Sequence, residues 1–172
     1  MTTAAAGRAG VDWPRWPEGM QPGECPVFVH NERRIDAPPE RVWKWLCRAD
    51  LWPSWFPRAS RVRFEAGGPE LAADACVVWR MLGATIRVRV RRCEPPFALD
   101  WEGGAQGVHA YHAWLLEPDG GGTRLVTEET ERGPLPWLAR WYLRGALHGA
   151  HEEWLASLAR IAPTGEPPAP KG

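Results

Sequence analysis

The sequence lacks a net charge, a long apolar run and a leader-like beginning. Its 21 basic residues balance its 21 acidic residues, which removes the usual electrostatic basis for nucleic-acid binding. No apolar run approaches the ~20 residues that cross a bilayer, and the first ten residues, MTTAAAGRAG, contain no apolar segment of signal-peptide type. We therefore expect one cytoplasmic domain with no nucleic-acid partner and no stable membrane insertion.

The common metal, cofactor and nucleophile motifs are also missing. Cys25, Cys47, Cys76 and Cys93 show no CxxC spacing, which favours small reduced residues over zinc ligands or disulfides. The glycine-rich stretches GGAQG and DGGGT lack the strand-to-helix context of a phosphate loop. No GxSxG, HExxH or Cys–His constellation occurs. We expect no cofactor and no metal ion.

Tryptophan, in contrast, is abundant, with 12 in 172 residues. Each indole supplies a large apolar surface and one polar N–H. The excess is compatible with a tightly packed core and with an aromatic-lined pocket. Composition alone does not choose between the two.

Most of the chain shows the period-two pattern of β-strands. The clearest example is the run in which Ile86, Val88 and Val90 alternate with arginines, giving one apolar face and one solvated face. A short helix is expected after Ala37, and a helical turn in the Trp- and Pro-containing stretch 51–57. Short turns between consecutive strands predict an antiparallel meander. The expected strands are 26–36, 61–65, 72–82, 86–91, 98–102, 108–117 and 123–132.

The longest periodic segment runs from Pro134 to Ile161 and predicts an amphipathic helix, because apolar residues recur every three or four positions. A long helix that follows many strands must bury its apolar stripe against their sheet. Gly145 and Gly149 lie one turn apart inside it. They favour either close approach to a strand or a flat patch that faces a ligand.

Four phrases in the right order resemble the SRPBCC, or START-like, helix-grip superfamily, which includes the polyketide cyclase/dehydrase family. They are IDAPPERVWKWLCRADLWPSWFP (35–57), PPFALDWE (95–102), WLLEPDGGGTRLVTEE (114–129) and HEEWLASLARI (151–161). The resemblance implies an α+β fold in which a curved antiparallel sheet of about seven strands wraps around a long C-terminal helix. It also implies two short helices after the first strand.

With this fold, the chain divides into an irregular N-terminal extension at 1–23, a helix-grip domain at 24–162 and a disordered tail at 163–172. Members of the superfamily, as the resemblance implies, bind hydrophobic small molecules between sheet and helix. Some members cyclise or dehydrate polyketides, and others carry lipids or act as co-chaperones. The fold alone therefore does not establish the function.

Strand parity predicts which side chains face such a cavity, because alternate residues share one face of a sheet. The two short helices and the long helix contribute the remaining candidates. The expected ligand-binding set is Trp55, Phe56, Val77, Trp79, Met81, Val88, Trp101, His112, Trp114, Thr127, Glu129, Leu138, Trp141 and Tyr142.

Two of these residues, His112 and Glu129, are polar on an otherwise apolar wall. A His–Glu pair in a dry pocket suits general acid–base catalysis of the kind that cyclisation or dehydration requires. The alternatives are that the two groups only satisfy one another, or that a bulge shifts the parity and turns His109 and Tyr111 inward. His151 is expected on the surface.

Three functions follow as hypotheses. The first is binding of a hydrophobic, aromatic or polycyclic small molecule or lipid. The second is a polyketide cyclase/dehydrase-type enzyme that uses His112 and Glu129. The third is a co-chaperone-like interaction module with a filled core, for which Trp13, Trp16 and Trp137 are the candidate contact residues.

Overall fold

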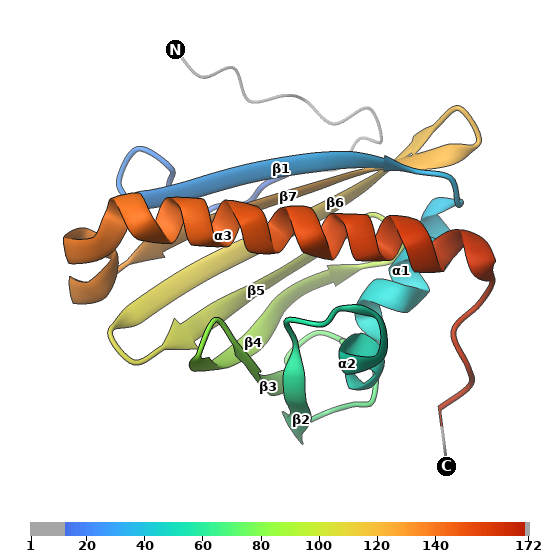
Figure 1. The fold of residues 1–172 in the computed structure, drawn as a ribbon, viewed down its shortest axis with the longest axis horizontal. Helices are drawn as coiled ribbons and strands as arrows, with labels where there is room; N and C mark the ends of the chain where they lie inside the picture. Colours follow the sequence, from blue (N-terminus) through green and yellow to red (C-terminus); the bar gives the residue numbers. More distant parts are fainter. Residues whose placement is uncertain (1–12, 171–172) are drawn as a thin grey trace.

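A computed structural model describes residues 13–170 and contains one seven-stranded sheet (Figure 1). Neighbouring strands are all antiparallel, in the order β1-β7-β6-β5-β4-β3-β2. The predicted meander is thus confirmed, with the first strand closing against the last. The strands are β1 (Val27–Ile35), β2 (Ser60–Ala66), β3 (Cys76–Met81), β4 (Ala84–Glu94), β5 (Ala98–Ala105), β6 (Val108–Asp119) and β7 (Gly122–Arg132).

Two short helices follow β1, and one long helix ends the domain, as the resemblance implies. They are α1 (Pro39–Cys47), α2 (Trp52–Trp55) and α3 (Pro134–Ile161). α3 crosses one face of the sheet, and α1 and α2 lie on the right-hand side of the view in Figure 1, with α2 below α1. We call the face under α3 the inner face and the opposite one the outer face. The α+β helix-grip fold is confirmed.

The sharp turn from β7 into α3 depends on Gly133. Its φ is +123°, and a Cβ atom there would lie 2.6 Å from the carbonyl oxygen of Gly107. A residue with a side chain would clash, so glycine alone suits this corner. Within α3, non-helical angles at Ala139 (φ −111°, ψ 21°) separate the first turn from the rest. The buried stripe begins beyond that kink, at Leu147, Ala150, His151, Trp154 and Leu158.

The register of the sheet aligns inner-face residues in rows that cross the strands. In one row Glu129 of β7 pairs with His112 of β6, which pairs with Trp101 of β5. In the next row, two residues further from α1, Glu131 pairs with Ala110, and Ala110 with Gly103. The first row has three large side chains, two of them polar. In the second row Glu131 supplies the one carboxyl group, and Ala110 and Gly103 are small.

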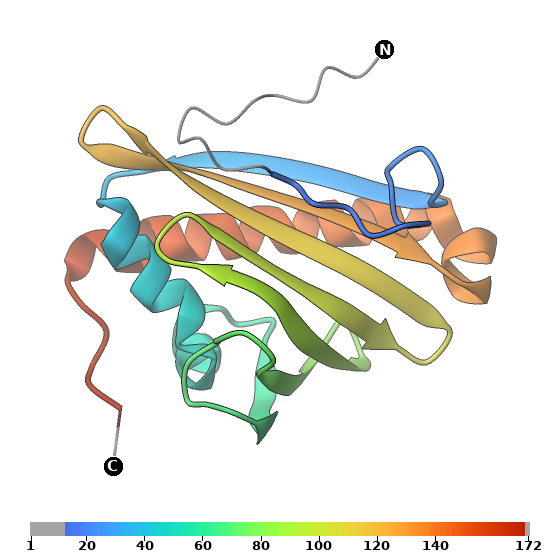
Figure 2. The same ribbon diagram turned by 180° about the vertical axis from the view of Figure 1, so that it is seen from behind.

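The described part of the N-terminal extension lies along the outer face of β6 and β7 (Figure 2). Trp16 contacts the ring of Tyr111 at a centroid distance of 5.5 Å, and Thr130 donates a hydrogen bond to the carbonyl oxygen of Met20. Met20 itself is buried. The extension therefore does not enter the space between the sheet and α3 in residues 13–23, whereas residues 1–12 lie outside the described part.

The predicted C-terminal tail lies against α1 in its described part. Trp45 Nε1 donates to the carbonyl oxygen of Gly165 at 2.9 Å, and Lys44 pairs with Glu166 at 2.9 Å. The division of the chain at residues 23 and 163 stays a prediction. No helix of residues 13–170 is long and apolar enough to cross a membrane.

Candidate functional site

An aromatic cluster fills the inner face near α1 and α2. Trp101 contacts the rings of Trp52, Trp114 and Trp154 at centroid distances of 5.8–6.2 Å. Phe56 stacks on Trp154 at 4.6 Å. These rings come from α2, β5, β6 and α3, so they join every layer of the domain. At this end of the fold the abundant tryptophan forms packed core.

His112 and Glu129 meet at the edge of this cluster. Nδ1 of His112 lies 3.2 Å from Oε2 of Glu129, and both side chains are buried. Nε2 of the same imidazole lies 2.5 Å from the hydroxyl oxygen of Thr127. Burial, with a smaller contribution from His151, holds the pKa of His112 well below its usual range. The imidazole is therefore neutral at physiological pH.

His151 completes a group of three polar residues. It lies on α3 with 0 % of its surface exposed, and its Nε2 is 3.0 Å from the same Oε2 of Glu129. Its ring is stacked on that of His112 with centroids 4.6 Å apart. The expectation that His151 is a surface residue is wrong. The spacing 147, 151, 154, 158 already lies on the apolar stripe of α3, and that periodicity was the available signal.

Glu131 adds a second buried carboxyl group beside Glu129. Only 6 % of its surface is exposed, and its Oε2 finds no hydrogen-bond partner among residues 13–170. Burial, reinforced by the charge of Glu129, raises the pKa of Glu131 to about 8, so at neutral pH this carboxyl is mostly protonated. Glu131 lies on the same face of β7 as Leu125 and Glu129, because alternate residues of a strand share a face. Glu131 was therefore predictable as a candidate site residue from this alternation, but it was not among the predicted residues.

The expected ligand-binding residues fall into two sets. The larger set belongs to the core or borders it, with every member buried: Trp55, Phe56, Val77, Trp79, Met81, Val88, Trp101, His112, Trp114, Thr127 and Glu129. The smaller set is on the first half of α3, where Leu138, Trp141 and Tyr142 are 76 %, 74 % and 76 % exposed. The structure brings the first set together and leaves the second apart from it. His109 and Tyr111, the alternative pair, lie on the outer face, where Tyr111 contacts Trp16.

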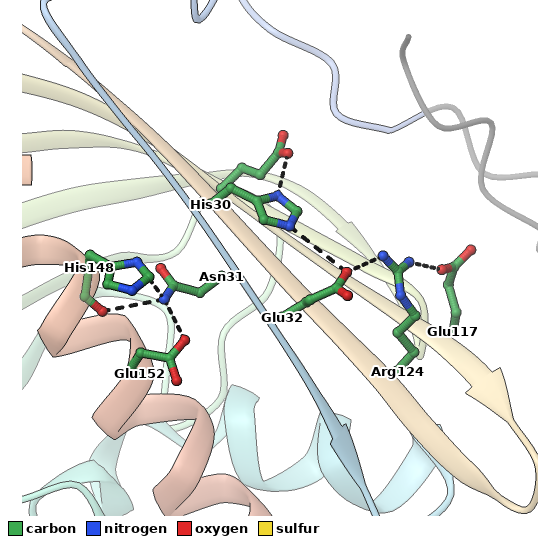
Figure 3. Close-up of polar contacts among 8 residues, drawn as sticks. His30, Asn31, Glu32, Glu117, Arg124, His148 and Glu152 are labelled. Atoms are coloured by element: carbon green, nitrogen blue, oxygen red, sulfur yellow. Dashed lines mark hydrogen bonds and ion pairs between the residues drawn. The ribbon is translucent and has the colours of Figure 1, made fainter. Parts of the chain in front are cut away.

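One side of α3 is fastened to β1 by Asn31, as Figure 3 shows. The Asn31 amide nitrogen is 2.9 Å from Nδ1 of His148 and 2.6 Å from Oε1 of Glu152. Arg33 adds an ion pair to Glu152 at 3.2 Å. The ion pairs of Arg124 with Glu32 and Glu117 lie on the outer face in the same view. The second half of α3 is therefore held in place over β1.

The side of α3 that faces away from β1 is directed toward β2, and its residues make few contacts. Beyond the kink at Ala139, Tyr142, Gly145, Gly149 and Glu153 follow one another at three- and four-residue spacing, which puts them on one stripe. Glu153 at its end pairs with Arg58, just before β2, so the stripe faces away from β1. A Cβ atom at Gly145 or Gly149 would have no heavy atom within 4 Å among the neighbours considered. The expected close approach to a strand is not found at these glycines.

A pocket of about 460 Å³ lies on the outer face, between the N-terminal segment and β4–β6. Charged groups line it, among them Arg15, Arg92 and the buried Asp100. Burial raises the pKa of Asp100 to about 6, against a hydrogen bond from Tyr111. This polar pocket does not suit an apolar ligand.

Comparison with known families and structures places this fold in context. A family model described as "Polyketide cyclase / dehydrase and lipid transport" matches residues 27–162. A hypothetical protein, jhp0584 from Helicobacter pylori, is 23 % identical with a TM-score of 0.80, over 94 % of this chain and 99 % of that one. No curated protein sequence matches the chain.

Two more distant solved structures share the fold. The Zhui aromatase/cyclase from Streptomyces sp. R1128 is 18 % identical with a TM-score of 0.70, over 79 % of this chain and 93 % of that one. TTHA0849 from Thermus thermophilus is 20 % identical with a TM-score of 0.66, over 80 % of this chain and 97 % of that one. At these identities the likeness establishes the fold alone.

Proposed function

We propose, on the premise that the chain belongs to the polyketide cyclase/dehydrase and lipid-transport family, that it binds a hydrophobic, aromatic or polycyclic small molecule between the sheet and the first half of α3. The observation that carries this proposal is the exposed stripe of α3. Tyr142 is 76 % exposed on that stripe, and Leu138, just before the kink, is equally exposed. The two glycines beyond Tyr142 present a flat surface. Flat apolar ligands stack well on such walls.

The sheet offers a matching wall. The small-residue row of Ala110 and Gly103 lies beside the polar row of His112 and Glu129. Small side chains leave ring-sized ligands room to approach the strands, and the protonated carboxyl of Glu131 at the end of the row is a hydrogen-bond donor for a ligand carbonyl. The rings of the aromatic cluster contact one another, so in this proposal they close one end of the ligand site and do not line its interior. The existence of an aromatase/cyclase with this fold supports a ring-containing ligand.

The test is ligand capture by the purified full-length chain. Native mass spectrometry with organic extraction identifies a co-purified molecule, and an apolar fluorescent probe such as anilinonaphthalene sulfonate reports binding. Gly145→Leu puts a side chain on the stripe, and Tyr142→Ala removes an aromatic ring from it. We expect both to weaken probe binding at least tenfold. Trp137→Ala, which removes an exposed ring elsewhere on α3, serves as the matched control. Equal binding by all four proteins would refute the site.

A second candidate function is favoured by the His112–Glu129 contact. Neutral His112 beside a carboxylate is a competent general base, and protonated Glu131 a general acid, for cyclisation or dehydration of a polyketide-like substrate. With a ligand from the capture experiment, His112→Asn should abolish turnover and leave binding within about threefold if the protein is an enzyme. Binding without any turnover by the unaltered chain supports a carrier.

The interaction-module hypothesis is less well supported. Trp13 and Trp16 pack against the outer face, next to Met20 and Tyr111, so they do not form a free contact surface. Trp137 alone of the three is largely exposed.

A further inference from the structure

We propose that His112, Glu129 and His151 form a binding site for a first-row divalent metal ion such as Zn²⁺. The three side chains converge from β6, β7 and α3, and one candidate donor atom from each lies within 4.8 Å of the others. This inference does not depend on the proposed ligand binding. It rests on His112, Glu129 and His151, whereas the ligand proposal rests on the exposed stripe of α3.

The distances suit a metal centre. Nδ1 of His112 and Nε2 of His151 lie 3.2 Å and 3.0 Å from Oε2 of Glu129. Zinc binds nitrogen and carboxylate oxygen at about 2.0–2.2 Å, so two tetrahedral ligands lie about 3.3 Å apart. Both nitrogen–oxygen separations are close to this value, and the two stacked imidazole rings, whose planes are 23° apart, would have to turn toward one ion to bind it together. Two imidazoles and one carboxylate form a donor set that zinc and other borderline metals accept.

The surroundings of His112 are those of a metal ligand. When one imidazole nitrogen binds a metal, the other usually carries a proton and donates it to an oxygen, which fixes the ring. Nε2 of His112 has such a partner in the hydroxyl of Thr127. Metal binding at Nδ1 thus requires only that the proton of His112 move to Nε2. Thr127 is in this sense a positioning residue.

A second, independent observation points to a cation. Glu131 is two residues along the strand from Glu129, is 6 % exposed, and has an Oε2 without a partner among residues 13–170. The side-chain hydrogen-bond and ion-pair partners of Glu129 in the same range are the two histidines. Within the described part of the chain, two carboxyl groups are thus buried side by side with no arginine or lysine paired to either. A divalent cation would compensate the negative charge of Glu129.

The alternative is a metal-free network in which both imidazoles donate to Glu129. The two possibilities differ in how they respond to Glu129→Gln. The amide keeps the shape and one acceptor oxygen, and so preserves much of a hydrogen-bond network. It removes the charged donor, and so eliminates a metal site.

The experiment measures metal content and spectra of the full-length chain. Because the group is buried, the metal is supplied during expression or refolding, and excess is removed by gel filtration. We expect one Zn²⁺ per chain by elemental analysis, and a visible d–d band typical of four-coordinate cobalt after refolding with Co²⁺. At free Zn²⁺ about 100 times Kd, Tm should rise by about 5–10 °C.

The variants separate this site from surface histidines. Glu129→Gln and His151→Gln should lose stoichiometric metal and the cobalt band, and Thr127→Val should weaken binding about 10–100-fold. His148→Ala is the matched control, since His148 lies three residues before His151 on α3 but is exposed. The proposal is overturned if the unaltered chain takes up no metal during refolding. It is equally overturned if folded Glu129→Gln retains one ion per chain, or if His148→Ala abolishes uptake.

Discussion

Phe56, the residue that follows α2, lies flat on Trp154 of α3, with ring centroids 4.6 Å apart and planes 18° from parallel. Both side chains are completely buried. The contact joins a four-residue helix that has few hydrogen bonds of its own to the longest helix of the domain. α2 is therefore held by side-chain packing more than by its backbone.

The first prediction concerns this aromatic core. Trp154→Ala should lower the free energy of unfolding by about 3–5 kcal/mol, because it removes a buried indole and leaves a cavity among the remaining rings. Urea unfolding followed by circular dichroism measures the change. Trp137→Ala, at a residue 67 % exposed, should stay within about 0.5 kcal/mol. A cost below about 1 kcal/mol for Trp154→Ala would mean that the rings are loosely packed and open to a ligand. If the variant does not fold, Trp154→Phe replaces it.

The second prediction concerns the N-terminal segment. Met20 is 1 % exposed and packs beside Cys25, Tyr111 and Ala113 on the outer face. Met20→Ala should therefore cost about 2–5 kcal/mol, as for a residue of the core. Leu135→Ala, at a residue 44 % exposed, is the control. Thermal unfolding of the two variants decides whether the domain begins before residue 24. No difference between them would support the predicted boundary.

The fold was predictable from the sequence because the signals were local. The alternation at Ile86–Val90 indicated a strand, and the three- and four-residue spacing beyond Pro134 indicated the long helix. Each pattern follows from the geometry of a single element. The sheet register then placed His112 opposite Glu129, which the parity of two neighbouring strands was sufficient to anticipate.

The rest of the site depends on how elements pack, which local patterns do not specify. His151 reaches Glu129 only because α3 crosses β7 at that point. Leu138 and Tyr142 are apolar and periodic, yet they are exposed because the kink at Ala139 and the fastening of α3 to β1 leave this part of the helix without a partner among the described residues. Periodicity predicts an apolar stripe, whereas the neighbour that covers it is decided by tertiary structure.

The third prediction is a pH dependence that originates at Asp100. Burial raises its pKa to about 6 in the folded chain, against about 4 in an unfolded one. Between these values Asp100 binds more protons in the folded state than in the unfolded state, so its contribution to stability falls as pH rises from about 4 to 6 and is constant above that. The loss is about 3 kcal/mol at most. In Asp100→Asn this part of the pH profile should be absent.

Urea unfolding at a series of pH values from 4 to 8 measures this difference between the two proteins. Asp74→Asn is a suitable control, because Asp74 is an exposed aspartate that pairs with Arg89 at the surface. Parallel profiles for Asp100→Asn and the unaltered chain would show that Asp100 stays ionised in the folded state, stabilised by Arg92 and Tyr111.

The fourth prediction compares the same substitution at two glycines. Gly103 has a φ of +155°, and a Cβ atom there would lie 2.1 Å from the carbonyl oxygen of Arg87. Gly103→Ala must push β5 away from β4, and should cost at least about 1–3 kcal/mol. Gly145 lies in a helix, and a Cβ atom added to it would have no heavy atom within 4 Å among the neighbours considered. Gly145→Ala should therefore stabilise the chain by about 0.5–1 kcal/mol, because alanine favours the helix.

Measured by chemical denaturation, opposite signs at the two positions would establish that Gly103 is needed for the contact between strands and that Gly145 is not needed for folding. Interior glycine weakens a helix, so a glycine at position 145 that folding does not require would support the proposal that this stripe of α3 binds a ligand. Destabilisation by Gly145→Ala would instead show that α3 approaches the sheet backbone closely. The proposed ligand would then have no room on that stripe.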